Sequence, residues 1–217
     1  IPYSYILIDK KKNINFFGNL KKISTAFKKN FNKVKFIDIN STIKILSKID
    51  KKKFIIDDAT CSIFFENIIL KNNKILNSKD TIYFLKAIKT KNEIENIKKA
   101  HIYDGAALTK YLFWLKNNFL KKKITEIGAA QKLFNFRKKN KSFKFLSFPT
   151  ISGAGPNGAI IHYRANKISQ KKLDRDGLYL IDSGAHYLEG TTDTTRTIKI
   201  GKVSSEMKKN YTLVLKG

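Results

Sequence analysis

The sequence predicts an α/β (α+β) fold in two parts: a small α/β domain over residues 1–80 and a larger domain over residues 81–217. Up to about residue 80, short apolar runs of strand length alternate with helix-like runs, which is typical of an α/β domain. Beyond that point the pattern changes to long helices followed by a hairpin rich in β-branched residues. The 217 residues, 42% of them hydrophobic, are sufficient for a buried core.

In the first 80 residues, strand-like and helix-like runs follow one another. Apolar runs at residues 3–8, 14–17, 33–37 and 54–56 predict strands. Apolar residues that recur every three or four positions predict helices over residues 20–31, 43–49 and 60–70. Ser41 is the expected N-cap of the second helix, because a serine oxygen can accept a hydrogen bond from the first helical turn.

From residue 81 onward the helix signals are stronger. Thr90 and Glu93 have the spacing of a capping box, in which each side chain bonds to the backbone of the other residue. A long helix with an apolar stripe should follow and end at the lysines of residues 121–123. Thr125 is a second expected N-cap. Apolar residues 178–181, a turn near residues 187–190 and the β-branched run 191–200 predict a β-hairpin.

The net charge of +27 is compatible with binding to nucleic acid or to an anionic membrane surface. Only four of the 44 basic residues are arginines, however, and the lysines are spread along the chain. Proteins that read nucleic acid rely on arginine, because its guanidinium binds guanine and phosphate through two hydrogen bonds. We therefore interpret the charge as a solvated lysine surface and do not expect nucleic acid as a partner. Polyanion binding is the alternative.

The cysteine count and the hydropathy argue against proteins that are rich in disulfides, bind zinc through cysteines or span a membrane. Cys61 is the single cysteine, which excludes a disulfide within the chain and argues against a cysteine-based zinc site. No apolar run reaches the roughly 20 residues that cross a bilayer, and no signal peptide is visible. We expect a cytoplasmic protein without membrane attachment, although the chain begins with Ile1 and its natural N-terminus can lie upstream.

Asp182 and Asp193 carry the expected chemistry. Asp182 follows the apolar residues 178–181, and Asp193 lies among threonines on the returning strand, so the hairpin should bring the two carboxylates together. Because like charges repel in a low-dielectric site, a shared proton, a cationic side chain or a metal must offset them. Two divalent ions on hard oxygen ligands can hold a hydroxide and polarise a carbonyl. From spacing alone, two unrelated turn or surface residues are the alternative.

The wider sequence around these acids resembles a known family. Residues 178–197 (LYLIDSGAHYLEGTTDTTRT) resemble the first metal-binding hairpin of the Xaa-Pro aminopeptidases, members of the pita-bread metallopeptidases. Residues 148–163 (FPTISGAGPNGAIIHY) resemble the same family, as do residues 85–93, 100–105 and 211–217. The resemblance implies a creatinase-like second N-terminal domain over 1–80. It also implies the first part of a pita-bread (creatinase/aminopeptidase-like) catalytic domain, truncated, over 81–217.

The resemblance also implies roles for individual residues. Asp182 would bind one metal and Asp193 would bridge two divalent ions, expected to be manganese, with zinc or cobalt as alternatives. His162 would be the catalytic histidine near the scissile bond, and it would line the substrate site together with Tyr163. The expected substrate is a peptide with proline at its second position, and the intact protein is expected to be a homodimer. Within the same fold, a dipeptidase acting on Xaa-Pro, a creatinase-like hydrolase and a non-catalytic binding module are the alternatives.

Other polar residues are given smaller roles, and part of the implied ligand set is missing. We expect His101 and Asp104 to be structural, His186 to be a strand-end histidine, and Asn157 to lie in a tight turn. The family completes its site with one His and two Glu that follow the hairpin, and Glu206 cannot replace both glutamates. The chain is therefore expected to be part of a longer protein and inactive by itself.

Overall fold

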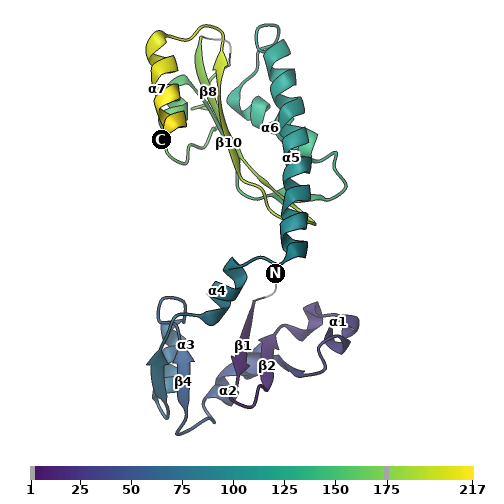
Figure 1. Ribbon diagram of the computed structural model, residues 1–217, viewed down its shortest axis with the longest axis vertical. Helices are drawn as coiled ribbons and strands as arrows, with labels where there is room; N and C mark the ends of the chain where they lie inside the picture. Colours follow the sequence, from purple (N-terminus) through teal and green to yellow (C-terminus); the bar gives the residue numbers. More distant parts are fainter. Residues whose placement is uncertain (1–2, 174–175) are drawn as a thin grey trace. The chain divides into compact units, whose positions relative to one another are not determined.

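The computed structural model describes residues 3–173 and 176–217 and divides the chain into two compact units, Ile1–Ile88 and Lys89–Gly217 (Figure 1). The expected division after residue 80 falls before helix α4 (Thr81–Ala87), which the structure groups with the first unit. In the described residues, no helix combines the length and the apolar character needed to cross a membrane.

From residue 3 onward, the first unit contains two small sheets. In one of them β1 pairs antiparallel with β2, which pairs parallel with β3, and in the other β4 pairs parallel with β5. The strands are β1 (Ser4–Ile8), β2 (Ile14–Gly18), β3 (Val34–Asp38), β4 (Lys53–Ile56) and β5 (Lys74–Asn77). The four expected strands are confirmed to within one or two residues at each end, whereas β5 and α4 were not predicted.

Short helices connect the strands of the first unit. They are η1 (Leu20–Lys22), α1 (Thr25–Lys29), η2 (Ile39–Ser41), α2 (Thr42–Leu46) and α3 (Ile63–Leu70). The single helix expected over residues 20–31 is wrong, because Ser24 adopts an extended conformation and accepts a hydrogen bond from the Phe27 N–H. That side chain begins a new helix in the middle of the periodic run. Ser41 does occupy the expected N-cap position of α2, but its side chain makes no capping hydrogen bond.

Over residues 89–173 and 176–217, three α-helices shape the second unit: α5 (Lys91–Asn118), α6 (Glu126–Arg137) and α7 (Ser205–Lys216). The capping box at the start of α5 is confirmed, because Thr90 accepts from the Glu93 N–H while the Glu93 carboxylate accepts from the Thr90 N–H at 2.7 Å. Thr125 caps α6 by accepting from the Gly128 N–H at 3.2 Å. Local capping therefore fixes both helix starts as predicted.

The strands of the second unit form two antiparallel sheets. One has the order β10-β8-β7, and the other pairs β6 with β9. The strands are β6 (Phe143–Leu146), β7 (Ile151–Ala154), β8 (Gly177–Ser183), β9 (Ala185–Tyr187) and β10 (Thr194–Ile200), and η3 (Gly155–Ala159) follows β7. The predicted hairpin is confirmed as the β8–β10 pair, with the Tyr187 N–H bonded to the Gly190 carbonyl at its turn.

The main core of the second unit lies between the helices and one face of β8. Tyr179 and Ile181 of β8 are fully buried against Tyr111 and Leu115 of α5 and Leu133 of α6. In Figure 1, α5 runs alongside β8 and β10 with α6 beside it. Since strand side chains alternate between faces, the residues between the buried ones, including Asp182, are on the opposite face of β8 and are half-buried.

Candidate metal centre

The strand pairing sets the position of the two acids. Asp182 of β8 lies opposite Thr195 of β10. The pairing continues beyond the named strands without a shift, because the Thr192 N–H donates to the Ala185 carbonyl at 2.9 Å and a bridge joins positions 186 and 191. Asp193 therefore lies in register opposite Gly184, and the two acids are diagonal neighbours across the hairpin. Such neighbours have backbones roughly 7–8 Å apart on one face of a sheet.

The two carboxylates have different surroundings. Asp182 is half-buried, and its Oδ1 accepts a hydrogen bond from the Thr195 hydroxyl at 2.8 Å. Asp193 is exposed and directly precedes β10. Arg196 does not neutralise them, because its Nη1 donates to the Thr195 carbonyl at 2.7 Å. In the part of the chain that the structure describes, neither acid forms an ion pair with Lys or Arg.

Gly184 permits the close pairing at this point of the hairpin. A Cβ at this position would overlap the Thr192 carbonyl oxygen and the Ser147 Oγ. The Ser147 hydroxyl itself donates to the Thr192 carbonyl at 3.0 Å, and the Thr192 hydroxyl accepts from the Ala185 N–H at 3.0 Å. Only a residue without a side chain fits between these groups.

The donor set fits part of a divalent-metal site. Carboxylate oxygens are hard ligands, and two acids that lack a cationic partner in a strongly basic chain leave negative charge for a cation to neutralise. Residues 3–173 and 176–217 contain no cluster of three or more His, Cys, Asp or Glu that could hold a metal. Asp182 and Asp193 can therefore supply two ligands of a larger set, and their role as ligands stays a prediction.

His162 lies on the connection between β7 and β8, in a turn of unusual geometry. The turn is closed by the Tyr163 N–H, which donates to the Ile160 carbonyl at 3.2 Å. His162 has a φ of 54° and an exposed side chain. A left-handed conformation costs a residue with a side chain about 1–2 kcal/mol, and it persists only where the surrounding structure enforces it.

Tyr163, the second residue of the expected substrate site, points away from solvent. Its side chain is only 5% exposed. Its hydroxyl donates a hydrogen bond to Glu126 Oε2 at 2.8 Å and accepts one from the Asn157 Nδ2 at 2.8 Å. Burial is the main cause that raises the pKa of its phenol above the usual value, and the Glu126 carboxylate adds to the shift. Contact of Tyr163 with a substrate stays a prediction.

Comparison with known proteins decides the family. Residues 95–217 match the model of metallopeptidase family M24, and residues 1–93 match that of the creatinase/prolidase N-terminal domain. The chain belongs to metallopeptidase family M24. The expected fold, a small N-terminal domain followed by the first part of a pita-bread catalytic domain, is thereby confirmed.

Relatives and solved structures agree with this M24 assignment. The chain is 50% identical over 147 residues to a probable Xaa-Pro aminopeptidase P of Paracoccidioides lutzii, and 53% identical over 134 residues to that of Coccidioides posadasii. These matches cover 67% and 61% of the chain but 24% and 22% of the relatives. The chain thus spans about a quarter of the length of these curated relatives.

Two solved structures illustrate the shared fold. An X-prolyl aminopeptidase from Caenorhabditis elegans, described as a cytosolic enzyme with a di-nuclear active site, superposes with a TM-score of 0.86 at 28% identity. The match covers 100% of this chain and 37% of that one. A prolidase from Pyrococcus furiosus has a TM-score of 0.73 at 24% identity, over 98% of this chain and 60% of that one.

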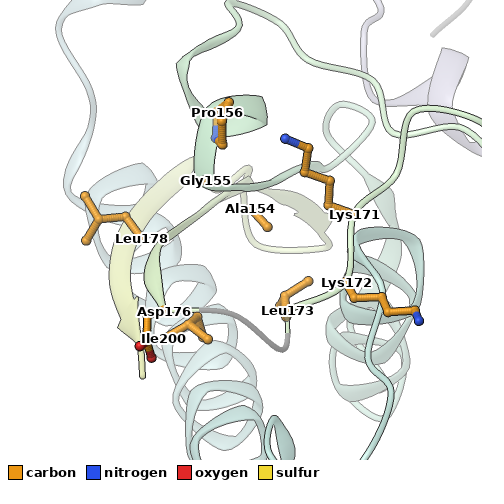
Figure 2. A pocket seen from close by; sticks show the side chains of 9 residues that line it. All are labelled: Ala154, Gly155, Pro156, Lys171, Lys172, Leu173, Asp176, Leu178 and Ile200. Carbon is orange, nitrogen blue, oxygen red and sulfur yellow. The ribbon is translucent and has the colours of Figure 1, made fainter. Parts of the chain in front are cut away.

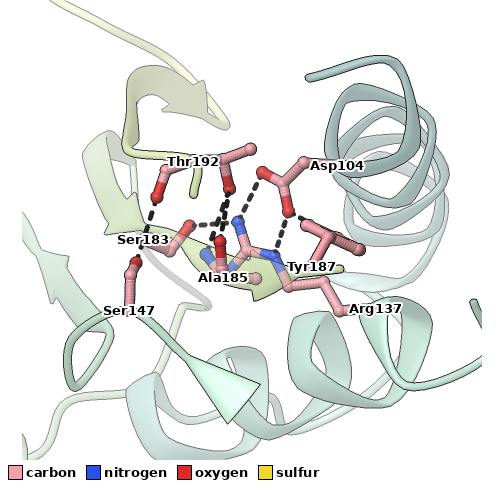
Figure 3. A network of polar contacts seen from close by, with 7 residues as sticks. All are labelled: Asp104, Arg137, Ser147, Ser183, Ala185, Tyr187 and Thr192. Carbon is pink, nitrogen blue, oxygen red and sulfur yellow. Dashed lines mark hydrogen bonds and ion pairs between the residues drawn. The ribbon is translucent and has the colours of Figure 1, made fainter. Parts of the chain in front are cut away.

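A buried ion pair lies behind β8, the strand of the M24 unit that carries Asp182. Arg137 of α6 donates through Nε and Nη2 to the two carboxylate oxygens of Asp104 on α5, at 2.7 and 2.9 Å. Nη2 also contacts Ser183 Oγ at 3.1 Å, and the Tyr187 hydroxyl donates to Asp104 Oδ1 at 2.8 Å (Figure 3). Ser183 directly follows Asp182, so this network connects two helices to the strand that carries the acid.

A separate cavity of about 590 Å³ lies at the ends of the connection between β7 and β8. It is lined by Ala154, Gly155, Pro156, Lys171, Lys172, Leu173, Asp176, Leu178 and Ile200 (Figure 2). Figure 2 shows the Lys171 side chain directed towards Pro156, whereas Lys172 points away from the other lining residues. Neither Asp182 nor Asp193 lines this cavity, so it is distinct from the acidic pair.

The sequence analysis missed two buried charged residues of this unit, Glu126 and Arg137, which are both 0% exposed. Glu126 follows the predicted cap Thr125 and has the pattern of an ordinary acidic residue in a first helical turn. His186, expected to be a strand-end histidine, lies in β9, where its Nδ1 is 2.6 Å from the Thr191 hydroxyl and its ring packs on Phe145.

Proposed function

We propose that the intact protein hydrolyses the peptide bond between an N-terminal residue and a following proline, with the help of two divalent metal ions. The observation that carries this proposal is the pair Asp182 and Asp193 on one face of an uninterrupted hairpin. The relatives named Xaa-Pro aminopeptidase P at about 50% identity support the choice of substrate. The related C. elegans enzyme, with its di-nuclear active site, supports two metal ions.

In this proposal Asp182 and Asp193 are both metal ligands. The Thr195 hydroxyl holds Asp182 Oδ1 and leaves the second oxygen available, while the exposed Asp193 can offer both of its oxygens. Manganese is the proposed metal, with zinc or cobalt as the alternatives. When bound, two divalent ions activate a water molecule and stabilise negative charge on the carbonyl oxygen. The proposal assigns the further ligands to residues outside those described, which hold no cluster of three or more His, Cys, Asp or Glu.

His162 is the proposed catalytic side chain of this chain. Its imidazole is exposed, and it can act as a general acid or base close to the scissile amide. Tyr163 belongs to the proposed substrate site as the residue that anchors the turn from the buried side. Because the amide nitrogen of proline carries no hydrogen, a site without an acceptor for that hydrogen favours proline over other residues.

The proposal is tested on the intact protein loaded with Mn²⁺. We expect release of the first residue from a tripeptide with proline at its second position, and much slower release when alanine replaces proline. Asp182→Asn and Asp193→Asn should each abolish turnover and weaken metal binding measured by calorimetry. Glu95→Gln, an exposed acid on α5, is the matched control and should change neither property.

The alternatives predict different outcomes of the same assay. Cleavage of an Xaa-Pro dipeptide but not of the tripeptide would assign the chain to a prolidase, a class that shares the fold. A folded, metal-loaded protein that cleaves neither substrate would contradict the proposal. The homodimeric state and a cytoplasmic location also belong to the proposal; sedimentation of the intact protein and cell fractionation test them.

A further inference from the structure

One buried carboxylate holds both ends of the connection that carries His162. Glu126, at the start of α6, is 0% exposed. Its Oε1 accepts from the Ala154 N–H at 2.7 Å, at the end of β7. Its Oε2 accepts from the Lys171 N–H at 3.0 Å, shortly before β8 begins. The two anchored amides are 17 positions apart in the sequence, and the His162 turn lies between them.

The same carboxylate also holds the middle of this connection. The Asn157 Nδ2 lies 3.0 Å from Oε1 and 3.2 Å from Oε2, and the Tyr163 hydroxyl donates to Oε2 at 2.8 Å. Asn157 continues the network to the Ser169 carbonyl at 3.1 Å. In the described residues every partner of the Glu126 carboxylate is a hydrogen-bond donor, so both of its oxygens act as acceptors only. A carboxylate meets this demand, whereas an amide would turn its own N–H groups towards these donors.

His162 depends on these anchors for its position. In the described residues its imidazole makes no hydrogen bond, and the side chain is exposed, so its location follows from the main chain alone. The adjacent residue Tyr163 is fixed by Glu126, and the turn has a positive φ at His162. A strained turn relaxes when the contacts that enforce it are removed. Loss of the Glu126 carboxylate should therefore displace the imidazole.

We propose that Glu126 is a positioning residue that acts through His162, a proposal that rests on the proposed peptidase activity. Glu126 touches neither substrate nor metal in this proposal. It fixes the conformation of residues 154–171 and thereby holds the imidazole at the distance that proton transfer or hydrogen bonding to the substrate requires. A role in folding alone would lower stability without any coupling to His162.

The decisive experiment is a double-mutant cycle on the intact, Mn²⁺-loaded protein. His162→Ala should lower kcat by about 10²-fold or more, and Glu126→Gln by roughly 10- to 10²-fold, which is typical of a misplaced catalytic group. The double variant should be no slower than His162→Ala, because Glu126 has nothing left to position. Leu133→Ala, a buried truncation on the same helix, is the control and should leave kcat unchanged at a temperature where it stays folded.

Hydrogen exchange of the backbone amides supplies a readout that does not depend on activity. Glu126→Gln should speed exchange in residues 155–171 and leave β8 protected, and Asn157→Ala should do so to a smaller extent. If Glu126→Gln does not fold, Asn157→Ala takes its place in the cycle. Multiplicative losses of kcat in the double variant, or unchanged exchange in residues 155–171, would overturn the proposal. If Glu126→Gln speeds exchange as expected but the wild-type protein cleaves no Xaa-Pro peptide, the proposed function fails while the anchoring by Glu126 stands.

Discussion

Replacing Arg137 with methionine should destabilise the second unit by about 3–5 kcal/mol, the usual cost of removing one partner of a buried ion pair. Arg137 and Asp104 are 0% and 2% exposed, and two hydrogen bonds of 2.7 and 2.9 Å join them. In the variant, Asp104 keeps the Tyr187 hydroxyl as a donor but loses the countercharge. A buried carboxylate with one neutral donor either remains charged at high cost or takes up a proton.

The matching double variant, Asp104→Leu with Arg137→Met, should be far less destabilised than the sum of its parts. Replacement of both charges by apolar groups removes the desolvation cost, and the remaining penalty is the loss of hydrogen bonds by the Tyr187 and Ser183 hydroxyls, about 1–3 kcal/mol for each hydroxyl left unsatisfied. The single variant Asp104→Leu should be as severe as Arg137→Met, because it leaves a buried guanidinium.

The free energies are measured by urea unfolding of the intact protein and, locally, by hydrogen exchange of the β8 amides. Arg196→Met is the control, because Arg196 is exposed and should change stability by no more than about 0.5 kcal/mol. Additive losses in the double variant would refute the reasoning, since they would mean that the two charges stabilise the fold independently.

Three further predictions concern the same unit. Burial raises the pKa of Tyr179 to about 12, above the ordinary value for tyrosine of about 10, so its contribution to stability is complete below about pH 10 and is lost between about pH 10 and 12. Unfolding at alkaline pH should show this loss of roughly 3 kcal/mol, and Tyr179→Phe should reduce it. Thr90→Ala should cost about 1 kcal/mol by removing the cap of α5, measured by thermal unfolding, with the exposed Lys91→Ala as reference. Gly184→Ala should disrupt the hairpin between the two acids, because its Cβ overlaps the Thr192 carbonyl, and faster exchange of the β10 amides would report it.

The sequence predicted those parts of the fold that depend on neighbouring residues. Capping at Thr90 and Thr125 involves groups three positions away, so both helix starts were correct. The hairpin was found because alternating β-branched residues and a turn are local signals as well. The prediction of one helix over residues 20–31 was wrong for a reason that is also local. The serine at position 24 caps a new helix, and apolar periodicity does not reveal such a cap.

The candidate site was predictable only in part, because its support comes from distant segments. The acids Asp182 and Asp193 are 11 positions apart on one hairpin, and the resemblance drew attention to them. The role of Glu126 depends on hydrogen bonds to residues at positions 154, 157, 163 and 171, which are as far as 45 residues away in the sequence. A threonine followed by glutamate is the ordinary sequence of a helix start, so no local pattern separates this buried anchor from an exposed acid.

Arginine usage holds a signal that could have located the buried ion pair. In a chain with 44 basic residues of which four are arginines, lysine is the default cation, and each arginine is a candidate for a position where lysine does not suffice. A planar guanidinium binds a carboxylate through two parallel hydrogen bonds and tolerates burial better than an ammonium group. Arg137 does both, whereas Arg164 and Arg196 are exposed. The same reasoning predicts that Arg137→Lys, although it conserves the charge, recovers only a part of the stability lost in Arg137→Met, because an ammonium cannot bond both oxygens of Asp104 and reach Ser183 as well.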